Sequence, residues 1–330
     1  MNNLTDTYHR PITYMRISIT DRCNLRCTYC MPEEGINWQP KDEILRYEEI
    51  VRIVRVAATR GLKKVRVTGG EPLVRRGVID FIRMLRDVPG IETVALTTNG
   101  VFLKEAAADL YRAGLRHINI SLDSLDPETF ARIVRRDLFH RVWEGIEACE
   151  QVGFNPIKIN CVLQAGINDH EAIAFAQLTK RKPYHVRFIE YMPCANWDTW
   201  VKTYRPFHVT FDQIEAVLGK LIPVDATDKT AGPAENFTLP GGMGVIGFIH
   251  AVSHHFCDTC NRIRLTADGK MRPCLYSTTE VDFKSALRQD CTDDTLSTLL
   301  DQVMGVKPLY HELDRIPREK QLLTMVNIGG

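Results

Sequence analysis

The 330-residue sequence contains no long uninterrupted run of apolar residues. A membrane-spanning helix needs about 20 such residues, so the sequence predicts no transmembrane segment. The first ten residues, 1–10, also lack the apolar centre of a signal peptide. Together these absences predict a cytoplasmic protein that has no membrane among its partners.

The chain also carries little net charge, because 42 Lys and Arg residues balance 41 Asp and Glu residues to leave +1. A nucleic-acid-binding domain usually shows a strong basic excess, so we expect no nucleic acid partner. The sequence has no internal repeat and no low-complexity segment. Its length allows one large domain, or a large domain with a smaller appendage.

Short apolar segments alternate with amphipathic ones over the first two thirds of the sequence, as in an α/β protein with a parallel sheet. Helical patterns near 50–58, 81–85 and 143–150 separate some of the strands. After residue 195 the pattern changes: we expect a loop over 223–243, a hairpin of 261–267 and 270–274, and helices near 281–289 and 293–304. The six strands expected before that point are 14–19, 64–68, 93–98, 116–121, 157–162 and 185–190.

Three cysteines follow the first expected strand, where a parallel sheet usually places functional residues. Cys23, Cys27 and Cys30 have a C-x3-C-x2-C spacing. A four-iron cluster takes one thiolate per iron, so three thiolates leave one iron open to a ligand that is not protein. A zinc knuckle would need a fourth ligand close by, but the next such residues are His117 and Cys149. The spacing therefore favours a reactive iron–sulfur cluster.

A second triad, Cys257, Cys260 and Cys274, has a C-x2-C-x13-C spacing. This spacing alone is equally compatible with zinc, since His254, His255 or Cys291 could supply a fourth ligand. The presence of two triads, each one ligand short, favours two clusters. The remaining cysteines are interpreted as small apolar residues. They are Cys149, Cys161, Cys194 and Cys291.

Glycines and polar residues follow three other expected strands. Gly69 and Gly70 begin the segment Gly-Gly-Glu-Pro, and adjacent glycines let the backbone approach a ligand closely. The same segment could equally be a tight strand–helix turn. The segments 97–100 and 121–124 add Thr, Asn, Ser and Asp side chains at the same predicted edge, which could also be helix caps.

Basic residues alternate with apolar ones in several expected strands. Side chains two residues apart share one face of a strand, and that face can meet solvent or line the inside of a barrel. Cations that converge inside a barrel from separate strands would form a pocket for a triphosphate. These basic residues are Arg16, Arg66, Lys158, Arg262 and Arg264.

The first triad and Gly69-Gly70-Glu71-Pro72 resemble the motifs of radical S-adenosylmethionine enzymes. Within that superfamily, the chain resembles the GTP 3′,8-cyclases of molybdenum cofactor biosynthesis through 20–24, 256–275 and the terminal Ile328-Gly329-Gly330. The resemblance covers essentially the whole chain. It implies an α/β fold: an incomplete (β/α)6 TIM-like barrel over 1–222, whose open side is closed by a C-terminal region, 223–330, with a second 4Fe-4S cluster.

The resemblance also implies the ligands of these residues. The first 4Fe-4S cluster would bind S-adenosyl-L-methionine through its open iron, and the second would ligate the guanine base. Contacts to S-adenosylmethionine would come from Tyr29, Gly70, Ser121 and Met192. Contacts to GTP would come from Arg16, Arg66, Thr97, Lys158, Arg262 and Arg264. The tail, Gly329 and Gly330, would reach into the barrel and assist catalysis, with Arg16 as its expected partner.

In the implied reaction a 5′-deoxyadenosyl radical removes the hydrogen at ribose C3′, and the carbon radical attacks guanine C8. The implied partners are GTP, a reductant protein such as a flavodoxin or ferredoxin, and the cyclic pyranopterin monophosphate synthase that receives the product. A homodimer is compatible with the resemblance. Two alternatives stay open: a peptide-modifying radical enzyme with an auxiliary cluster, and a zinc-dependent binding module.

Overall fold

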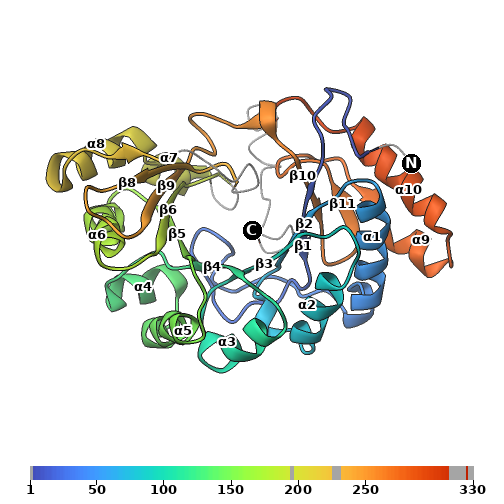
Figure 1. Cartoon of the computed structure of the whole chain (residues 1–330), viewed down its shortest axis with the longest axis horizontal. Coiled ribbons are helices and arrows are strands. Elements are labelled where there is room, and N and C mark those ends of the chain that lie inside the picture. Colours follow the sequence, from blue (N-terminus) through green and yellow to red (C-terminus); the bar gives the residue numbers. More distant parts are fainter. Residues whose placement is uncertain (1–2, 194–196, 225–231, 312–324, 326–330) are drawn as a thin grey trace.

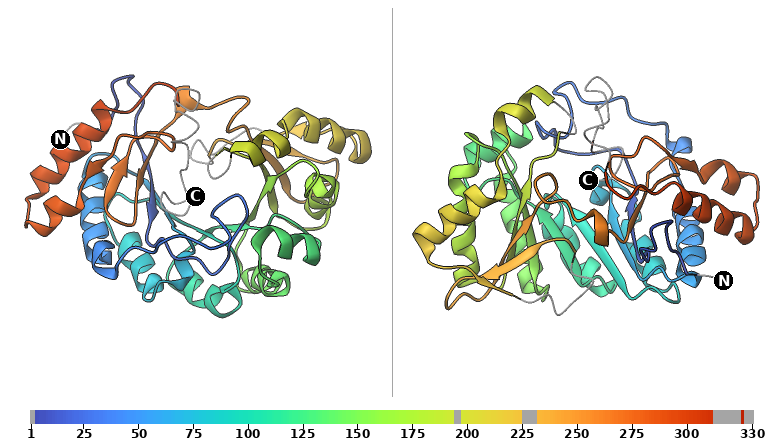
Figure 2. Two further views of the ribbon diagram at one scale, coloured as in Figure 1. Left: turned by 180° about the vertical axis from the view of Figure 1, so that it is seen from behind. Right: turned by 90° about the horizontal axis from the view of Figure 1, so that it is seen from above.

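The computed structural model describes residues 3–193, 197–224, 232–311 and 325 of the chain. Within them a twelve-stranded sheet has the order β12-β11-β10-β1-β2-β3-β4-β5-β6-β9-β8-β7. Its central strands, from β10 to β9, all run parallel. Figure 1 shows these strands on a curved, open path with helices on the outer side, and Figure 2 shows the same arrangement from behind and from above.

The six strands expected from the sequence form the middle of this sheet, and their observed ends agree with the prediction within one residue. They are β1 (Tyr14–Ser18), β2 (Lys64–Thr68), β3 (Thr93–Thr98), β4 (His117–Ser121), β5 (Ile157–Leu163) and β6 (His185–Glu190). This confirms the prediction of a parallel partial barrel.

The C-terminal region extends both edges of the sheet. β10 (Arg262–Leu265) pairs parallel with β1, and β9 (Val245–Ile249) pairs parallel with β6. Antiparallel strands then continue each edge. They are β11 (Lys270–Arg272) and β12 (Val281–Asp282) beyond β10, and β8 (Glu235–Thr238) and β7 (Ile222–Pro223) beyond β9.

Helices cover the outer face of the sheet, and α10 packs beside α1. None of the helices in the described part of the chain is both long and apolar enough to cross a membrane. The helices are α1 (Tyr47–Thr59), α2 (Val78–Arg86), α3 (Leu103–Arg112), α4 (Pro127–Val134), α5 (Phe139–Gln151), α6 (Ala172–Arg181), α7 (Trp197–Thr203), α8 (Phe207–Leu218), α9 (Lys284–Arg288) and α10 (Asp293–Gly305), with 3-10 turns η1 (Lys41–Glu43), η2 (Pro72–Val74), η3 (Asp169–Glu171) and η4 (Cys257–Thr259).

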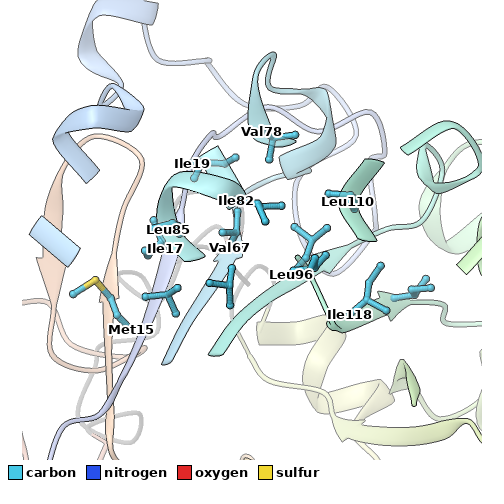
Figure 3. Packing of buried hydrophobic residues seen from close by; sticks show 14 of the residues in the cluster. Met15, Ile17, Ile19, Val67, Val78, Ile82, Leu85, Leu96, Leu110 and Ile118 are labelled. Carbon is cyan, nitrogen blue, oxygen red and sulfur yellow. The ribbon is translucent and has the colours of Figure 1, made fainter. Parts of the chain in front are cut away.

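Alternate residues of the central strands form the core against these helices. Met15 and Ile17 of β1 and Val67 of β2 are fully buried and meet Ile82 and Leu85 of α2 (Figure 3). Burying one such side chain stabilises the fold by roughly 1.5–3 kcal/mol. Because successive side chains of a strand point to opposite faces, the residues between them face the inner side of the curve.

Two sequence predictions about the C-terminal region are wrong. The loop predicted over 223–243 contains β8. Residues 281–282, predicted as the start of a helix, form β12 instead. Glu235 and Asn236 are poor strand formers, yet they pair antiparallel with β9. Pairing with a neighbouring strand decides strand formation more than intrinsic preference does, so a local pattern could not reveal β8.

Candidate functional site

A cavity of about 300 Å³ lies on the inner side of the curved sheet. It is lined by residues from most of the central strands and from the loops that follow them. The structure thus brings together twelve residues that the sequence singled out from distant segments. They are Arg16, Cys23, Cys27, Tyr29, Cys30, Arg66, Gly70, Thr97, Ser121, Met192, Arg262 and Arg264.

Other predicted site residues lie beside the cavity or outside the described chain. Lys158 of β5 does not line the cavity, but it shares a strand face with Asn160 and Val162, which do. The second triad lies next to it, since Phe256 and Leu275, adjacent to Cys257 and Cys274, line the cavity. The tail residues Gly329 and Gly330, like Cys194, lie outside the described residues.

The first cysteine loop is fixed by the end of α4. Asp126 caps that helix by accepting a hydrogen bond from the Thr129 N–H at 2.8 Å. At its other end, the Val134 and Ile133 carbonyls accept hydrogen bonds from the backbone of Arg26 and Thr28 at 3.1 and 2.9 Å. These hydrogen bonds fix the backbone of the loop that carries Cys27.

The donor set of the first triad fits a cationic cluster. Burial, followed by the nearby Cys30, Asp123 and Cys23, raises the pKa of Cys27 well above its usual value. Burial likewise raises the pKa of Cys23 to about 11. Neighbouring thiols that resist ionisation need a positive charge among them to become thiolates, and a bound metal supplies such a charge.

A buried carboxyl group lies beside this loop. Tyr29 donates a hydrogen bond from its hydroxyl to Asp123 Oδ2 at 2.6 Å, and the Val162 N–H donates to Asp123 Oδ1 at 2.8 Å. Burial raises the pKa of Asp123 to about 6, although both hydrogen bonds oppose the shift. The contact places the Tyr29 ring at the cavity wall, where contact with S-adenosylmethionine was expected.

The glycines of Gly69-Gly70-Glu71-Pro72 allow two loops to pack closely against each other. A Cβ on Gly70 would lie 2.3 Å from the Arg22 carbonyl oxygen, and a Cβ on Gly69 would lie 2.7 Å from the Thr20 carbonyl oxygen. The Gly70 N–H donates to the Thr20 carbonyl at 2.7 Å. These glycines hold the cysteine loop against the second strand–helix turn, whatever ligand the cavity takes.

The strand register arranges the basic residues in two neighbouring rows. Arg264, Arg16 and Arg66 are direct partners across β10, β1 and β2. Two residues earlier, Arg262, Tyr14 and Lys64 form the second row on the same face. The alternation seen in the sequence therefore faces the cavity rather than solvent.

Tyr14 is embedded in this cationic cluster. The Arg66 Nε donates a hydrogen bond to the Tyr14 hydroxyl at 2.7 Å, and a second Arg66 nitrogen donates to Thr97 Oγ1 at 3.2 Å. Burial alone would raise the pKa of Tyr14, but Arg66, Arg16 and Arg262 together lower it to about 7. The phenol thus partly balances the positive charge of the guanidinium groups.

The cavity carries more positive charge than its own residues compensate. Its lining contains six Lys and Arg side chains but two carboxylates, Asp123 and Glu190. Burial and the Arg264 guanidinium lower the pKa of Arg16 to about 9. Among the described residues, nothing forms a hydrogen bond with the buried Nε of Arg262. Buried like charges are costly unless paired, so this wall fits a polyanionic ligand.

We predict that the affinity of the cavity for inorganic triphosphate falls as the pH rises above about 7. A bound anion would raise the pKa of Tyr14 again, so binding takes up a proton in that range, and linkage then weakens affinity by up to about tenfold per pH unit. Calorimetry in buffers of different ionisation enthalpy measures this uptake. In Tyr14→Phe, the proton uptake on binding should be that of the triphosphate alone. An equal proton uptake in the variant and in the parent protein would contradict the prediction.

The second triad is built from η4 and the end of the β10–β11 hairpin. Cys257 lies in η4, Cys260 directly follows it, and Cys274 follows β11. Burial raises the pKa of Cys257, and the nearby Cys274 and Cys260 raise it further. In the described part of the chain, neither triad is part of a His, Cys, Asp or Glu group that could hold a single metal ion.

Comparison with known proteins identifies the family. Residues 17–179 match the Radical SAM superfamily, and residues 184–313 match the family Molybdenum Cofactor Synthesis C. The chain is 44% identical to the GTP 3′,8-cyclase of Pelotomaculum thermopropionicum and 45% identical to that of Heliobacterium modesticaldum, over 99% of this chain and 100% of each relative. The chain belongs to the GTP 3′,8-cyclase family. The cyclase of Thermodesulfovibrio yellowstonii is 46% identical over the same shares of both chains.

Solved structures share the fold of this cyclase family member at low sequence identity. Streptococcus suis SuiB bound to the precursor peptide SuiA has a TM-score of 0.61 at 17% identity, covering 92% of this chain and 67% of its own. The structure of anSMEcpe with bound AdoMet has a TM-score of 0.55 at 16% identity, covering 94% of this chain and 88% of its own. Membership of the radical S-adenosylmethionine superfamily implies S-adenosylmethionine and a 4Fe-4S cluster.

Several residues of the cyclase cavity were missed from the sequence. Arg187 on β6 is buried, and burial followed by Arg66 lowers its pKa to about 10. It alternates with Val186 and Phe188 as Arg66 does with its own neighbours, so the same pattern could have revealed it. Asn119 and Asn160 carry buried side-chain oxygens that accept no hydrogen bond from the described residues, and no sequence pattern marks them.

Proposed function

We propose that this chain cyclises GTP to (8S)-3′,8-cyclo-7,8-dihydroguanosine 5′-triphosphate, the first step of molybdenum cofactor biosynthesis. The observation that carries the proposal is that one cavity is lined both by the first cysteine triad and by a cluster of six basic side chains. Full-length relatives at 44–46% identity named GTP 3′,8-cyclase support it.

Each triad would hold one 4Fe-4S cluster. Cys23, Cys27 and Cys30 would bind the cluster at the cavity wall, beside residues expected to contact S-adenosylmethionine: Tyr29, Gly70, Ser121 and Met192. Cys257, Cys260 and Cys274 would bind the second cluster near the guanine base. When bound, the first cluster and S-adenosylmethionine supply the carbon radical that removes a hydrogen atom from the ribose.

The residues of the chain itself supply binding and orientation. Thr97 and the cations Arg16, Arg66, Arg262 and Arg264 would hold the triphosphate on the inner face of β1, β2, β3 and β10, with Lys158 at the side. Because this end of the nucleotide is fixed, ribose C3′ and guanine C8 are kept at a constant place relative to the first triad. Orientation of this kind lowers a reaction barrier without any further chemical group.

The test is anaerobic incubation of the reconstituted protein with a reductant, S-adenosylmethionine and GTP deuterated at C3′. The product is an isomer of GTP, because the hydrogen atom lost is replaced by an electron and a proton. We therefore expect a new nucleotide on chromatography and deuterium in the 5′-deoxyadenosine. Absence of both in a protein with a full iron content would refute the proposal.

The peptide-modifying alternative makes a different demand on the cavity. A peptide substrate gives no reason for Arg16, Arg66 and Arg264 to form one row beside the first triad. The structural neighbours at 16–17% identity share the fold alone. A measurement of GTP binding in the absence of S-adenosylmethionine separates the two functions, since only the cyclase needs a binding site for GTP.

We predict that single alanine substitutions at Arg66, Lys158, Arg262 and Arg264 weaken GTP binding by about ten- to a hundredfold while the iron content stays unchanged. A charge-assisted hydrogen bond contributes about 1.5–3 kcal/mol. Arg83→Ala is the matched control, because Arg83 is exposed and pairs with Asp80 on α2. Unchanged affinity in all four variants, measured by calorimetry, would show that the triphosphate binds elsewhere.

The remaining partners follow from the proposed reaction. A flavodoxin or ferredoxin would supply the electron, and the product would pass to the cyclic pyranopterin monophosphate synthase. A reducing cytoplasm suits this chemistry, and the nine described cysteines are all free. The proposed division of the chain is 1–222 and 223–330, and a homodimer is a compatible assembly.

A further inference from the structure

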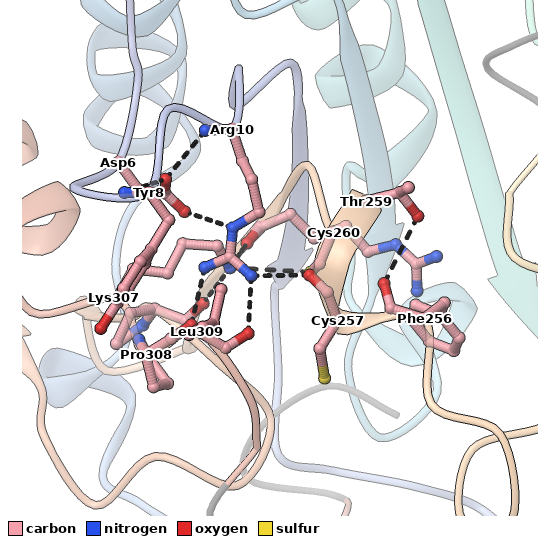
Figure 4. A network of polar contacts seen from close by, with 12 residues as sticks. Asp6, Tyr8, Arg10, Phe256, Cys257, Thr259, Cys260, Lys307, Pro308 and Leu309 are labelled. Atoms are coloured by element: carbon pink, nitrogen blue, oxygen red, sulfur yellow. Dashed lines mark hydrogen bonds and ion pairs between the residues drawn. The ribbon is translucent and has the colours of Figure 1, made fainter.

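Two buried cations from distant parts of the chain meet at the second cysteine triad. Arg10, near the N-terminus, is paired with Asp6 through its Nε at 2.6 Å. Its Nη1 donates to the carbonyl of Cys257 at 2.6 Å and of Leu309 at 2.8 Å, and its Nη2 donates to the Pro308 carbonyl at 2.6 Å. Figure 4 shows this guanidinium between the cysteine loop and the segment that follows α10.

Lys307 is the second cation, and all three of its donors have partners at the triad. Its Nζ donates to the Arg262 carbonyl at 2.7 Å and to the Pro273 carbonyl at 2.8 Å, and lies 3.6 Å from Cys260 Sγ. Pro273 directly precedes Cys274, and Arg262 follows Cys260 by two residues. Arg10 and Lys307 together therefore contact the Cys257 backbone, the Cys260 sulfur and the residue directly before Cys274.

The positive charge of Lys307 is buried and must be compensated by its neighbours. Lys307 is only 3% exposed, and among the described residues no carboxylate pairs with it. A buried ammonium is costly unless an anion or several hydrogen bonds compensate it. Two carbonyl oxygens and the Cys260 sulfur are its partners, and an ammonium beside a sulfur favours negative charge on that sulfur.

We propose that Lys307 and Arg10 are positioning residues of the second triad: Lys307 holds Cys260 as an anionic ligand and fixes the chain before Cys274, and Arg10 fixes Cys257. The inference rests on the proposed function, in which this triad binds a 4Fe-4S cluster. Groups that hold metal ligands in place typically change metal affinity by about ten- to a hundredfold. A cation beside a ligating sulfur also favours the reduced cluster and so raises its reduction potential.

The contacts of Lys307 also link the second triad to the basic side chains of the cavity. Lys307 holds the carbonyl of Arg262, whose side chain lines the cavity in the row of Tyr14 and Lys64. Arg10 holds the segment after α10 to the loop that contains Phe256, and the Arg262 guanidinium lies 4.7 Å from the centre of the Phe256 ring. Loss of Lys307 is therefore expected to disturb both the cluster and the orientation of Arg262.

The experiment compares Lys307→Met and Arg10→Met with the parent protein after anaerobic reconstitution. Both variants should lose iron to a chelator about ten- to a hundredfold faster from the second triad. Lys307→Met should also lower the midpoint potential of that cluster, measured by electron paramagnetic resonance in a chain that carries Cys27→Ala so that only the second triad contributes. Lys307→Arg, which keeps the charge, should restore most of the potential, and Lys307→Gln replaces Lys307→Met if the latter does not fold.

The matched control is Arg60→Met. Arg60 is as buried as Arg10, and it docks α10 through hydrogen bonds to Ser297 and Asp301. Its loss should lower the unfolding temperature but leave iron retention and potential unchanged. If Cys260→Ala keeps its full iron, the cluster assignment in the proposed function fails. If Cys260→Ala loses iron while the Lys307 and Arg10 variants behave like the parent, the positioning inference alone is overturned.

Discussion

Replacing Cys27 with alanine is expected to remove about half of the iron and to abolish cleavage of S-adenosylmethionine. The three cysteines of this loop share one buried wall of the cavity, and each would ligate a different iron. Two thiolates cannot hold the cluster in the geometry that leaves one iron open. Iron and sulfide analysis after anaerobic reconstitution, together with chromatographic detection of 5′-deoxyadenosine, measures both effects.

Two further variants separate this result from general loss of structure. Cys291→Ala changes a half-buried cysteine outside both triads, so its iron content and cleavage should match the parent protein. Cys260→Ala should lose the iron of the second triad, keep some cleavage of S-adenosylmethionine and form no cyclised nucleotide. Full iron content in either Cys27→Ala or Cys260→Ala would disprove the assignment of two clusters.

Deleting Gly329 and Gly330 is expected to lower turnover by about a hundredfold while the clusters and GTP affinity stay nearly intact. Two residues without side chains can enter a narrow opening, and misplacing a positioned group can reduce a rate by this factor. Met325, five residues before the C-terminus, lines the cavity and packs against Tyr276. The measurement is the rate of GTP cyclisation under single-turnover conditions.

A synthetic peptide ending in Asn-Ile-Gly-Gly gives the complementary test. Added to the truncated protein, it should restore part of the activity, whereas a peptide ending in Asn-Ile-Ala-Ala should restore less. Met325→Ser should lower turnover by a smaller factor, because it removes an apolar contact near Met192 and Leu275 but keeps the tail. Normal cyclisation by the truncated protein would mean that the tail is an ordinary frayed end.

The sequence predicted those features that repeat locally. Strands of five to seven residues rich in apolar residues, such as β1 and β5, were located within one residue. The alternation of basic and apolar residues placed Arg16 and Arg66 each opposite to its apolar neighbours, and the register then made the two arginines direct partners across β1 and β2. The spacing of residues within one short loop, such as Cys23 and Cys27, likewise predicted that they lie together.

Features that depend on contacts between distant segments could not be predicted. β8 is a strand only because β9 lies beside it, and the lowered pKa of Tyr14 needs guanidinium groups from three strands. Arg10 and Lys307 approach the second triad from positions about 250 residues before Cys257 and about 50 after it. No periodicity connects such positions, because their proximity is a product of the folded sheet.

The pairing of β10 with β1 affects the order in which the site is completed during synthesis of the chain. On a growing chain the first cysteine loop is made early, but Arg262 and Arg264 come only near the end. Until they dock, two of the six basic side chains of the cavity are missing. The part of the site that would activate S-adenosylmethionine thus exists before the part that recognises a polyanion is complete. A bound triphosphate would bridge β10 and β1, so the substrate itself would help to hold together the two ends of the protein.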